Sequence, residues 1–301
     1  MTRPIAFKSG QWLPLDEISI PLDDVGFVMG ATIVEQLRTF GGQVFRLEQH
    51  LARLRDSLAI IGLEIPFDDA QLTSVIHEIV AHNHRLLAPG DDLGVTILIT
   101  PGGVDRPGRS PLVCVHTRPI PFGSFVAKFE TGQALVVPAT RQTPIACWPR
   151  QLKVRSRVHY YLADVEARRI EADARAVLLD LDGYVMEATT ANFVVHLPHQ
   201  GLVAPPRELV LPGISIGALE DLARQLGIAY HERLMTPAEA DEADEILLTS
   251  TSPCVLPCHR WNGKQVGGGK PGPIFERLIS AWSESVGLDI RAQAARFSTR
   301  G

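Results

Sequence analysis

The sequence has 301 residues, of which 45% are hydrophobic and 21% charged, fractions that are usual for soluble folded domains and exclude a disordered chain. At ~150 residues per domain, the length predicts about two domains. The formal net charge is −5, which argues against a nucleic-acid partner because such binding draws on clustered basic side chains. Only five of the 29 basic residues are lysine.

The N-terminal segment, the apolar stretches and the cysteines indicate the cellular compartment in which we expect the protein. The apolar run after Met1 is too short for a signal peptide, and no stretch approaches the ~18 apolar residues that a membrane span needs. The four cysteines of a chain this long do not suggest a disulfide framework. We therefore expect a cytoplasmic protein with no membrane partner.

Residues 1–118 are predicted to form a small α/β domain. A hairpin around Ser9-Gly10 opens it, and an extended run over residues 31–40 ends at the turn Gly41-Gly42. Apolar residues then recur at the spacing of a helical face, which predicts two helices before two β-rich runs. These elements are expected at residues 47–61, 68–80, 95–100 and 112–116.

Two prolines and a glycine near residue 120 interrupt regular structure, so residues 119–133 are predicted to be an interdomain linker. Residues 134–301 form the larger predicted domain, in which strands and helices alternate. Its expected elements are a strand at 135–137, a helix at 158–170, a hairpin at Asp182-Gly183, a helix at 214–226, a short helix capped by Thr236, a strand at 246–249 and a helix at 275–286. The tail, residues 291–301, is expected to be frayed.

Three patterns that look like known sites are interpreted as structural. His77 and His82 are five residues apart, which turns them about 140° from each other on a helix and prevents them from sharing one metal ion. The run Gly267–Lys270 lacks the hydroxyl residue and the spaced glycine of a phosphate loop. Cys254 and Cys258 lack a second pair of metal ligands. No metal site is predicted.

Polar residues gather in three segments of the second half where core packing would not place them. Lys153 precedes a helix, and Glu187 follows a hairpin turn. Ile214-Ser215, in the third segment, begin a helix whose unpaired N–H groups can hold a phosphate. In addition to these three segments, Thr249–Ser252 offer hydroxyls at the end of an apolar strand. A lysine, a carboxylate and an anion cradle are the parts that hold pyridoxal phosphate.

At these residues the chain resembles the class IV aminotransferases, the fold type IV pyridoxal-phosphate enzymes that include branched-chain and D-amino-acid aminotransferases and aminodeoxychorismate lyase. The resemblance runs from about Asp23 to Gly287. It is carried by the order and spacing of several segments, including the 34 residues between Lys153 and Glu187. Those segments are residues 23–27, 45–54, Lys153 with Glu166-Ala167, 187–192, 211–215 and 243–251.

The resemblance implies an α/β fold of two domains, a small N-terminal one and a larger one with a β-barrel-like core. It implies pyridoxal 5′-phosphate as cofactor and a homodimer. Lys153 matches the lysine that forms the Schiff base and moves the proton, and Glu187 matches the partner of the pyridine nitrogen. Arg46 matches the phosphate-binding arginine, and the phosphate would also contact Ile214, Ser215 and Thr251.

Departures from the family pattern fall in the substrate region. The Tyr-x-Arg of branched-chain enzymes is replaced by Thr96-Ile97-Leu98, and Met29 and Val34 stand where larger aromatic residues are frequent. Candidate substrate contacts are Arg38, Met29, Thr96 and Ser252, with Arg106 and Arg109 as further possible carboxylate binders. Val158 replaces the frequent tyrosine that bonds the cofactor phenolate, for which Arg155, His159 or Tyr160 are the alternatives.

The resulting hypothesis is an aminotransferase that moves an amino group between an amino acid or amine and a 2-oxo acid, by a ping-pong Schiff-base mechanism. The alternative is a pyridoxal-phosphate-dependent lyase of the aminodeoxychorismate lyase type. A protein that keeps the fold without turnover is disfavoured because Lys153, Glu187 and Arg46 are all present. The choice of aminotransferase over lyase follows the commoner chemistry of the family. The amino donor, whether an L-amino acid, a D-amino acid or an (R)-amine, is left open.

Overall fold

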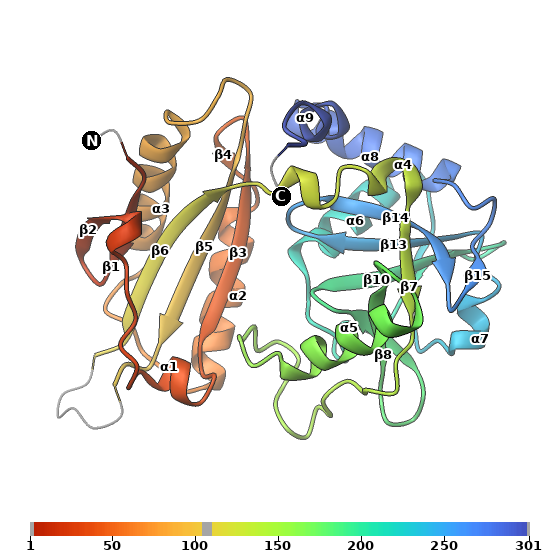
Figure 1. The fold of residues 1–301 in the computed structure, drawn as a ribbon, viewed down its shortest axis with the longest axis horizontal. Helices are drawn as coiled ribbons and strands as arrows, with labels where there is room; N and C mark the ends of the chain where they lie inside the picture. Colours follow the sequence, from red (N-terminus) through yellow and green to blue (C-terminus); the bar gives the residue numbers. More distant parts are fainter. Residues whose placement is uncertain (1–2, 104–109, 300–301) are drawn as a thin grey trace. The chain divides into compact units, whose positions relative to one another are not determined.

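The computed structural model describes residues 3–103 and 110–299. The chain divides into two compact units (Figure 1). Unit 1 comprises Met1–Ile120 with Gln151–Ser156, and unit 2 comprises Pro121–Arg150 with Arg157–Gly301. Within the described ranges, no helix is both long enough and apolar enough to cross a membrane.

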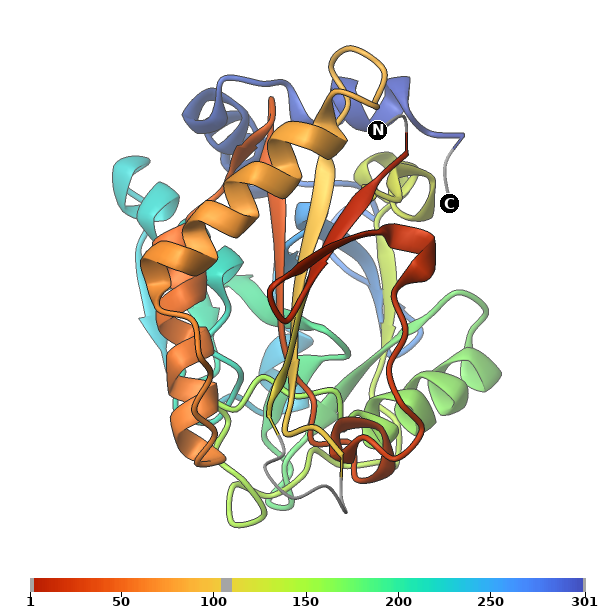
Figure 2. The same ribbon diagram turned by 90° about the vertical axis from the view of Figure 1, so that its left-hand side faces the viewer.

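Unit 1 is built on a six-stranded sheet in the order β2-β1-β6-β5-β3-β4, with antiparallel neighbours. Helices α2 and α3 lie against one face of this sheet, where their apolar stripes meet the strands (Figure 2). The elements of the unit are β1 (Ile5–Lys8), β2 (Gln11–Pro14), η1 (Leu15–Glu17), α1 (Val25–Val28), β3 (Ile33–Phe40), β4 (Gln43–Val44), α2 (Leu47–Ile60), α3 (Asp69–His84), β5 (Leu93–Thr100) and β6 (Leu112–Pro119).

Local sequence signals explain where these elements begin and end, and the predicted elements of the first 118 residues are confirmed. The β1–β2 turn has Ser9 and Gly10 at φ 46° and 93°, the left-handed conformation that suits a tight hairpin. Asp68 caps α3 in a reciprocal capping box with Gln71. Gly62, at φ 64°, follows the end of α2.

Strand β3 places a charged side chain in the apolar core of unit 1. Ile33 and Leu37 are buried in the apolar core of unit 1, as the two-residue period of a strand requires. Glu35 lies between them in the same alternation and is 0% exposed. A carboxylate at that position needs partners, because an isolated buried charge is strongly destabilising.

Unit 2 has a barrel-like core, as predicted. The strands β10-β13-β14-β7-β8-β9 are neighbours in that order, and a pairing of β9 with β10 closes the ring. Strands β11 and β12 extend the sheet from β10, and β15 pairs with β14. The elements are η2 (Phe122–Ser124), α4 (Lys128–Thr131), β7 (Gln133–Val136), α5 (Val158–Ile170), β8 (Arg175–Leu179), β9 (Val185–Ala188), β10 (Ala191–Leu197), β11 (Gly201–Ala204), α6 (Ile214–Gln225), β12 (Tyr230–Glu232), α7 (Pro237–Ala240), β13 (Glu245–Ser250), β14 (Cys254–Trp261), β15 (Lys264–Gln265), α8 (Pro273–Val286) and α9 (Ile290–Arg296).

Two stretches differ from the expected pattern. Residues 119–133 carry η2 and α4, with Phe122 and Phe129 buried in unit 2, because these aromatic side chains pack with others of that unit. Residues 151–156 belong to unit 1, although the sequence places them in the larger domain.

The predicted fraying of the tail was wrong over most of its length. Asp289 caps α9 by accepting a hydrogen bond from Ala292 N, and Ile290 and Ala294 are buried. The Phe297 ring stacks on Phe122 at 6.0 Å. This short amphipathic turn stays helical because it has both a cap and an apolar contact surface.

Candidate active site

The segment of Lys153 is fixed to unit 1 by its backbone. Lys153 O accepts a hydrogen bond from Val34 N at 3.0 Å, and Lys153 N donates to Ser57 Oγ at 3.1 Å. The neighbouring Val154 bridges to Ile33 of β3. Lys153 is thus anchored on β3 and α2 through main-chain atoms, which leaves its position independent of what its side chain binds.

A buried ion network lies on the same helix, α2. His50 Nδ1 is 2.7 Å from Glu35 Oε2, and Arg53 reaches both carboxylate oxygens of Glu35, with Nε at 2.8 Å and Nη2 at 2.7 Å. Burial alone would raise the pKa of Glu35, but the charge of Arg53 and the bonds from Arg53 and His50 lower it to about 2. Burial lowers the pKa of His50, and the charges of Arg53 and Lys153 act in the same direction.

This network of Glu35, His50 and Arg53 was not predicted from the sequence. The sequence pattern that could have predicted it is a charged residue, Glu35, at a core-facing position of a strand. His50 and Arg53 then lie beside the apolar stripe of the next helix. One turn of α2 separates Arg53 from Ser57, the residue that holds Lys153 N. The network therefore belongs to the surroundings of Lys153.

Replacing Glu35 with Gln is expected to lower the free energy of unfolding by about 3 kcal/mol near pH 7, because it removes one partner of a buried ion pair. Since the folded-state pKa lies below the ordinary 4.5, the stabilisation is full above pH 4.5 and is lost as the pH falls toward 2. Denaturant unfolding at a series of pH values from 7 down to about 2 measures this. The exposed Glu64→Gln serves as control, and equal stabilities of the two variants would contradict the assignment.

Arg46, the predicted phosphate ligand, lies at the N-cap of α2. It is half-buried at φ 50°, its Nη1 donates to Gln49 Oε1 at 3.3 Å, and its guanidinium lies 5.4 Å from the ring centre of Phe45. It is seven residues, or about two helical turns, before Arg53. Of Arg46 and Arg53, Arg53 lies nearer along the helix to Ser57, the residue that contacts Lys153 N.

In unit 2, Glu187 has the environment of a functional carboxylate rather than an exposed strand residue. It is 4% exposed, and its Oε1 accepts hydrogen bonds from Tyr160 Oη at 2.7 Å and Gln142 Nε2 at 2.8 Å. Its Oε2 accepts from Leu211 N at 3.2 Å. Burial and the charge of Glu187 raise the pKa of Tyr160 well above its usual range, so the phenol stays protonated and donates.

The start of α6 offers free donors. Gly213 is its N-cap and provides no side-chain cap, so among the described residues the first-turn amides of Ile214 and Ser215 have no recorded partner. A Cβ at Gly213 would lie 2.0 Å from Asn192 Oδ1, which is why glycine is required there. Asn192 Nδ2 also donates to Leu211 O at 2.8 Å. Glu187 and the α6 N-terminus are therefore held to each other through Leu211.

Arg150 is a second residue that sequence reasoning missed. It is 6% exposed, and its Nε and Nη2 have no hydrogen-bond partner among the described residues. Burial lowers its pKa, while the charge of Glu187 acts to raise it. Burial, with the charges of Arg150 and Arg157, lowers the pKa of His159 to about 4, so His159 is neutral at pH 7. Leaving two buried N–H-bearing nitrogens of a guanidinium unpaired is costly, which points to an anionic ligand beside Glu187.

The predicted substrate residues lie in different surroundings. Arg38 is 1% exposed with its guanidinium 4.0 Å above the centre of the Phe40 ring, and Thr96 Oγ1 donates to Gln36 Oε1 at 3.4 Å. Met29 is exposed at the end of α1. Ser252 and Thr251 lie in the turn between β13 and β14, whereas Arg106 and Arg109 lie outside the described residues.

Comparison with known proteins gives one consistent family. The pattern of the family described as amino-transferase class IV matches residues 32–261. The D-alanine aminotransferase of Bacillus licheniformis is 30% identical over 92% of this chain and 95% of its own length. The branched-chain-amino-acid aminotransferase of Salmonella typhimurium is 26% identical over 84% and 83%. Among solved structures, a T.th. branched-chain amino acid aminotransferase complexed with N-(5′-phosphopyridoxyl)-L-glutamate has a TM-score of 0.85 at 25% identity, covering 94% of each chain.

Proposed function

This chain belongs to the class IV aminotransferases and is a pyridoxal-phosphate-dependent aminotransferase, and we propose that it moves an amino group from an amino acid or amine to a 2-oxo acid by a ping-pong mechanism. The observation that carries the proposal is the coupling of buried Glu187 to the uncapped start of α6 through Leu211. The named relatives are aminotransferases, which does not favour the lyase alternative.

Pyridoxal phosphate supplies an aldehyde that takes up the amino group and a pyridinium ring that draws electrons from the substrate Cα. The residues present fit that group. Glu187 would hold the pyridine nitrogen in its protonated form. The amides of Ile214 and Ser215 would bind the phosphate, together with Ser215 Oγ and Thr251, because a helix N-terminus favours an anion.

Lys153 would bond the cofactor aldehyde through Nζ and, once released, carry the proton at the substrate Cα. Its backbone anchors would keep that amine in place through both halves of the reaction. The buried Arg150, whose Nε and Nη2 have no partner among the described residues, would hold the phenolate oxygen of the ring, the contact for which Val158 offers no polar group. Arg38, Met29, Thr96 and Ser252 remain proposed substrate contacts.

The phosphate-binding arginine is proposed to come from α2, and burial and position favour Arg53 over Arg46. Arg53→Lys keeps the positive charge beside Glu35 but loses the planar, forked donor geometry. We expect it to weaken cofactor binding about tenfold, with Arg46→Lys within about twofold of wild type. Fluorescence titration of the cofactor measures both. The reverse order would assign the role to Arg46, and equal affinities would exclude both arginines.

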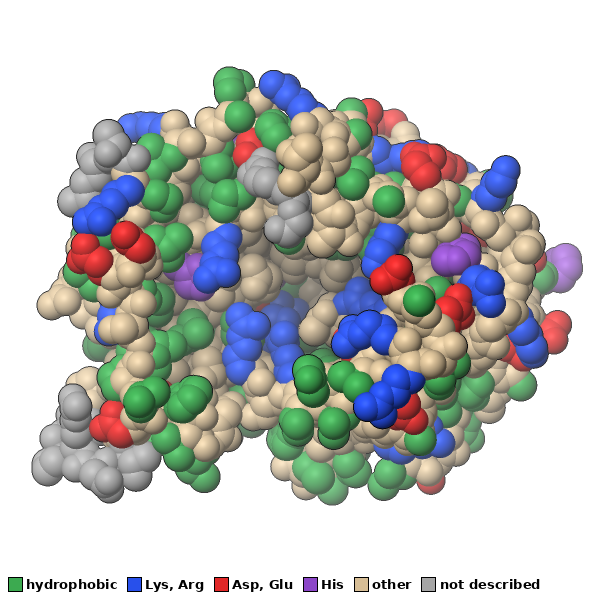
Figure 3. Space-filling model, in the orientation of Figure 1, with side chains coloured by type: hydrophobic (Ala, Val, Ile, Leu, Met, Phe, Trp, Pro, Cys, Tyr) green, Lys and Arg blue, Asp and Glu red, His purple; other side chains and the backbone are tan. Residues whose placement is uncertain are grey.

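A homodimer is also proposed. Helix α5 exposes a row of apolar side chains, and apolar side chains gather over this part of unit 2 in Figure 3. The exposed members are Val158, Tyr161, Leu162 and Ile170. Sedimentation of an active monomer would contradict a dimer. The four cysteines are free, which supports a cytoplasmic location.

The test of the function is the donor half-reaction. Cofactor-loaded protein is mixed with L-amino acids, D-amino acids or (R)-amines in the absence of an acceptor. An aminotransferase releases one oxo product per bound cofactor and then stops until a 2-oxo acid is added. Continuous release of ammonia or of an elimination product without an acceptor would instead indicate the lyase.

A further inference from the structure

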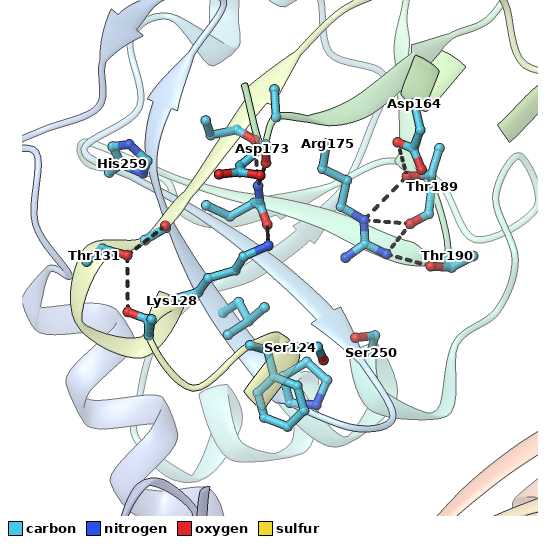
Figure 4. Close-up of a pocket in the computed structure, with 18 of the residues that line it drawn as sticks. Ser124, Lys128, Thr131, Asp164, Asp173, Arg175, Thr189, Thr190, Ser250 and His259 are labelled. Atoms are coloured by element: carbon cyan, nitrogen blue, oxygen red, sulfur yellow. Dashed lines mark hydrogen bonds between the residues drawn. The ribbon is translucent and has the colours of Figure 1, made fainter. Parts of the chain in front are cut away.

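A pocket of about 960 Å³ opens in unit 2 beside α4, the start of β8 and the β9–β10 turn (Figure 4). Its lining residues differ from those of the proposed cofactor site, because Glu187, Ile214, Ser215 and Thr251 do not line it. Only Ser252, among the proposed cofactor and substrate contacts, is shared. The pocket is large enough for a small metabolite and has no assigned role.

Three basic residues from different elements line this pocket: Lys128 of α4, Arg175 of β8 and the exposed Arg168 of α5. Arg175 of β8 donates from Nε to Thr189 O at 2.6 Å and from Nη2 to Thr189 O and Thr190 Oγ1. Its Nη1 has no recorded partner among the described residues, and Lys128 Nζ donates to Gln133 Oε1. Figure 4 shows the Lys128 and Arg175 side chains extending into the same hollow. Burial lowers the pKa of Lys128, and the charge of Arg175 lowers it further, as expected when two cations share a space.

The acidic residues of the pocket are mostly engaged elsewhere. Asp164 Oδ1 accepts hydrogen bonds from Ala176 N at 3.1 Å and from Thr189 Oγ1 at 2.8 Å. Glu171 pairs with Arg260, whose Nε is 2.9 Å away. Asp173 is the remaining carboxylate, and its charge favours the protonated form of Lys128. Glu171 is thus paired outside the pocket, while the charge of Asp173 acts on Lys128 and that of Asp164 acts on Arg175.

Further donors lie around the same space. The Ser250 hydroxyl makes no recorded hydrogen bond to a described residue, and the Thr190 hydroxyl, which accepts from Arg175, keeps its own hydrogen to donate. His259 Nδ1 is buried at the pocket wall without a partner in the described part of the chain. Basic side chains and hydroxyls that can donate therefore border the same space, an arrangement that suits an anion with several oxygens.

We propose that this pocket binds an oxyanion, the carboxylate or phosphate group of a small molecule, between Lys128 Nζ and Arg175 Nη1. The Ser250 and Thr190 hydroxyls donate to its remaining oxygens. Arg175 also holds the Thr189–Thr190 turn, which begins two residues after Glu187. The occupant therefore contacts a side chain that fixes the end of the strand carrying Glu187.

Calorimetric titration of the cofactor-loaded protein tests the proposal, because loading occupies the phosphate-binding start of α6. Inorganic phosphate and succinate are titrated separately at constant ionic strength, with chloride as the reference anion. We expect one saturable site per subunit, and the tighter of the two ligands identifies the source of the oxyanion. Saturable binding of either ligand supports the site, and absence of saturable binding for both overturns it.

Lys128→Gln is expected to weaken binding about tenfold or more, because it removes a charged donor. Lys264→Gln removes an exposed lysine of unit 2 that pairs with Asp241 and does not line the pocket, and should leave the affinity within about twofold. An equal loss of anion affinity in both variants would mean that the anion is attracted only by the general positive charge, and would overturn the proposed site. Arg175→Lys keeps a cation at the Thr189–Thr190 turn but loses the forked donor geometry of arginine. Its anion affinity should therefore lie between those of the wild type and Lys128→Gln.

Discussion

Replacing Lys153 with Ala is expected to reduce transamination by at least about 10⁴-fold at saturating cofactor, since the variant loses both the amine that bonds the cofactor and the group that moves the Cα proton. The contacts that fix this segment use Lys153 N and O, so the variant should fold like the wild type. Initial rates with the best donor, together with circular dichroism, measure both properties.

Lys153→Arg separates charge from nucleophilicity, because it keeps a cation that cannot lose its proton at neutral pH. It should be as inactive as Lys153→Ala. Lys264→Ala is the matched control, a lysine exposed on unit 2, and should keep the wild-type rate. A Lys153 variant within tenfold of wild type would remove this residue from the chemistry.

Replacing Glu187 with Gln is expected to slow the donor half-reaction by about two orders of magnitude or more while cofactor binding is retained. The amide preserves size, and its oxygen at the Oε1 position can still accept from Tyr160 and Gln142, but its NH2 cannot accept from Leu211 N, and it no longer favours a protonated pyridine nitrogen. Each pKa unit of lost stabilisation is about 1.4 kcal/mol between the two protonation states. Two units thus correspond to about 10²-fold if the transition state depends fully on the protonated ring.

Stopped-flow measurement of the half-reaction at saturating cofactor isolates this step from cofactor affinity. Glu208→Gln, an exposed carboxylate of the same unit, serves as control and should react at the wild-type rate. The arginine variants of α2 should show the opposite pattern, with weaker cofactor retention and a smaller change of rate. A Glu187→Gln rate equal to wild type would mean that Glu187 does not contact the ring nitrogen.

Local sequence rules predicted most of the secondary structure because the determinants are themselves local. The capping box at Asp68, the Ser9-Gly10 turn and the apolar spacing of α2 each act within a few residues. Helix α9 escaped prediction because its stability comes from a cap combined with tertiary burial of Ile290 and Ala294. The joining of residues 151–156 to unit 1 also depends on long-range pairing with β3 and α2.

The candidate site was predicted unevenly for the same reason. Lys153, Glu187 and the α6 start follow from spacing and from resemblance to the family. The partners of Glu187 come from segments up to 45 residues away, so Tyr160 and Gln142 could not be assigned by pattern alone. The burial of Arg53 and Arg150 could not be predicted from the sequence, because it is a property of the packed units.

Borohydride trapping tests the central claim most directly. The cofactor-loaded protein is reduced with borohydride, digested and mapped by mass spectrometry for the lysine that carries the phosphopyridoxyl group. The account predicts a single modification, at Lys153, with Lys8, Lys128, Lys264 and Lys270 unmodified. A label at any of those four lysines, or a protein that retains no cofactor and takes up no label, would contradict it.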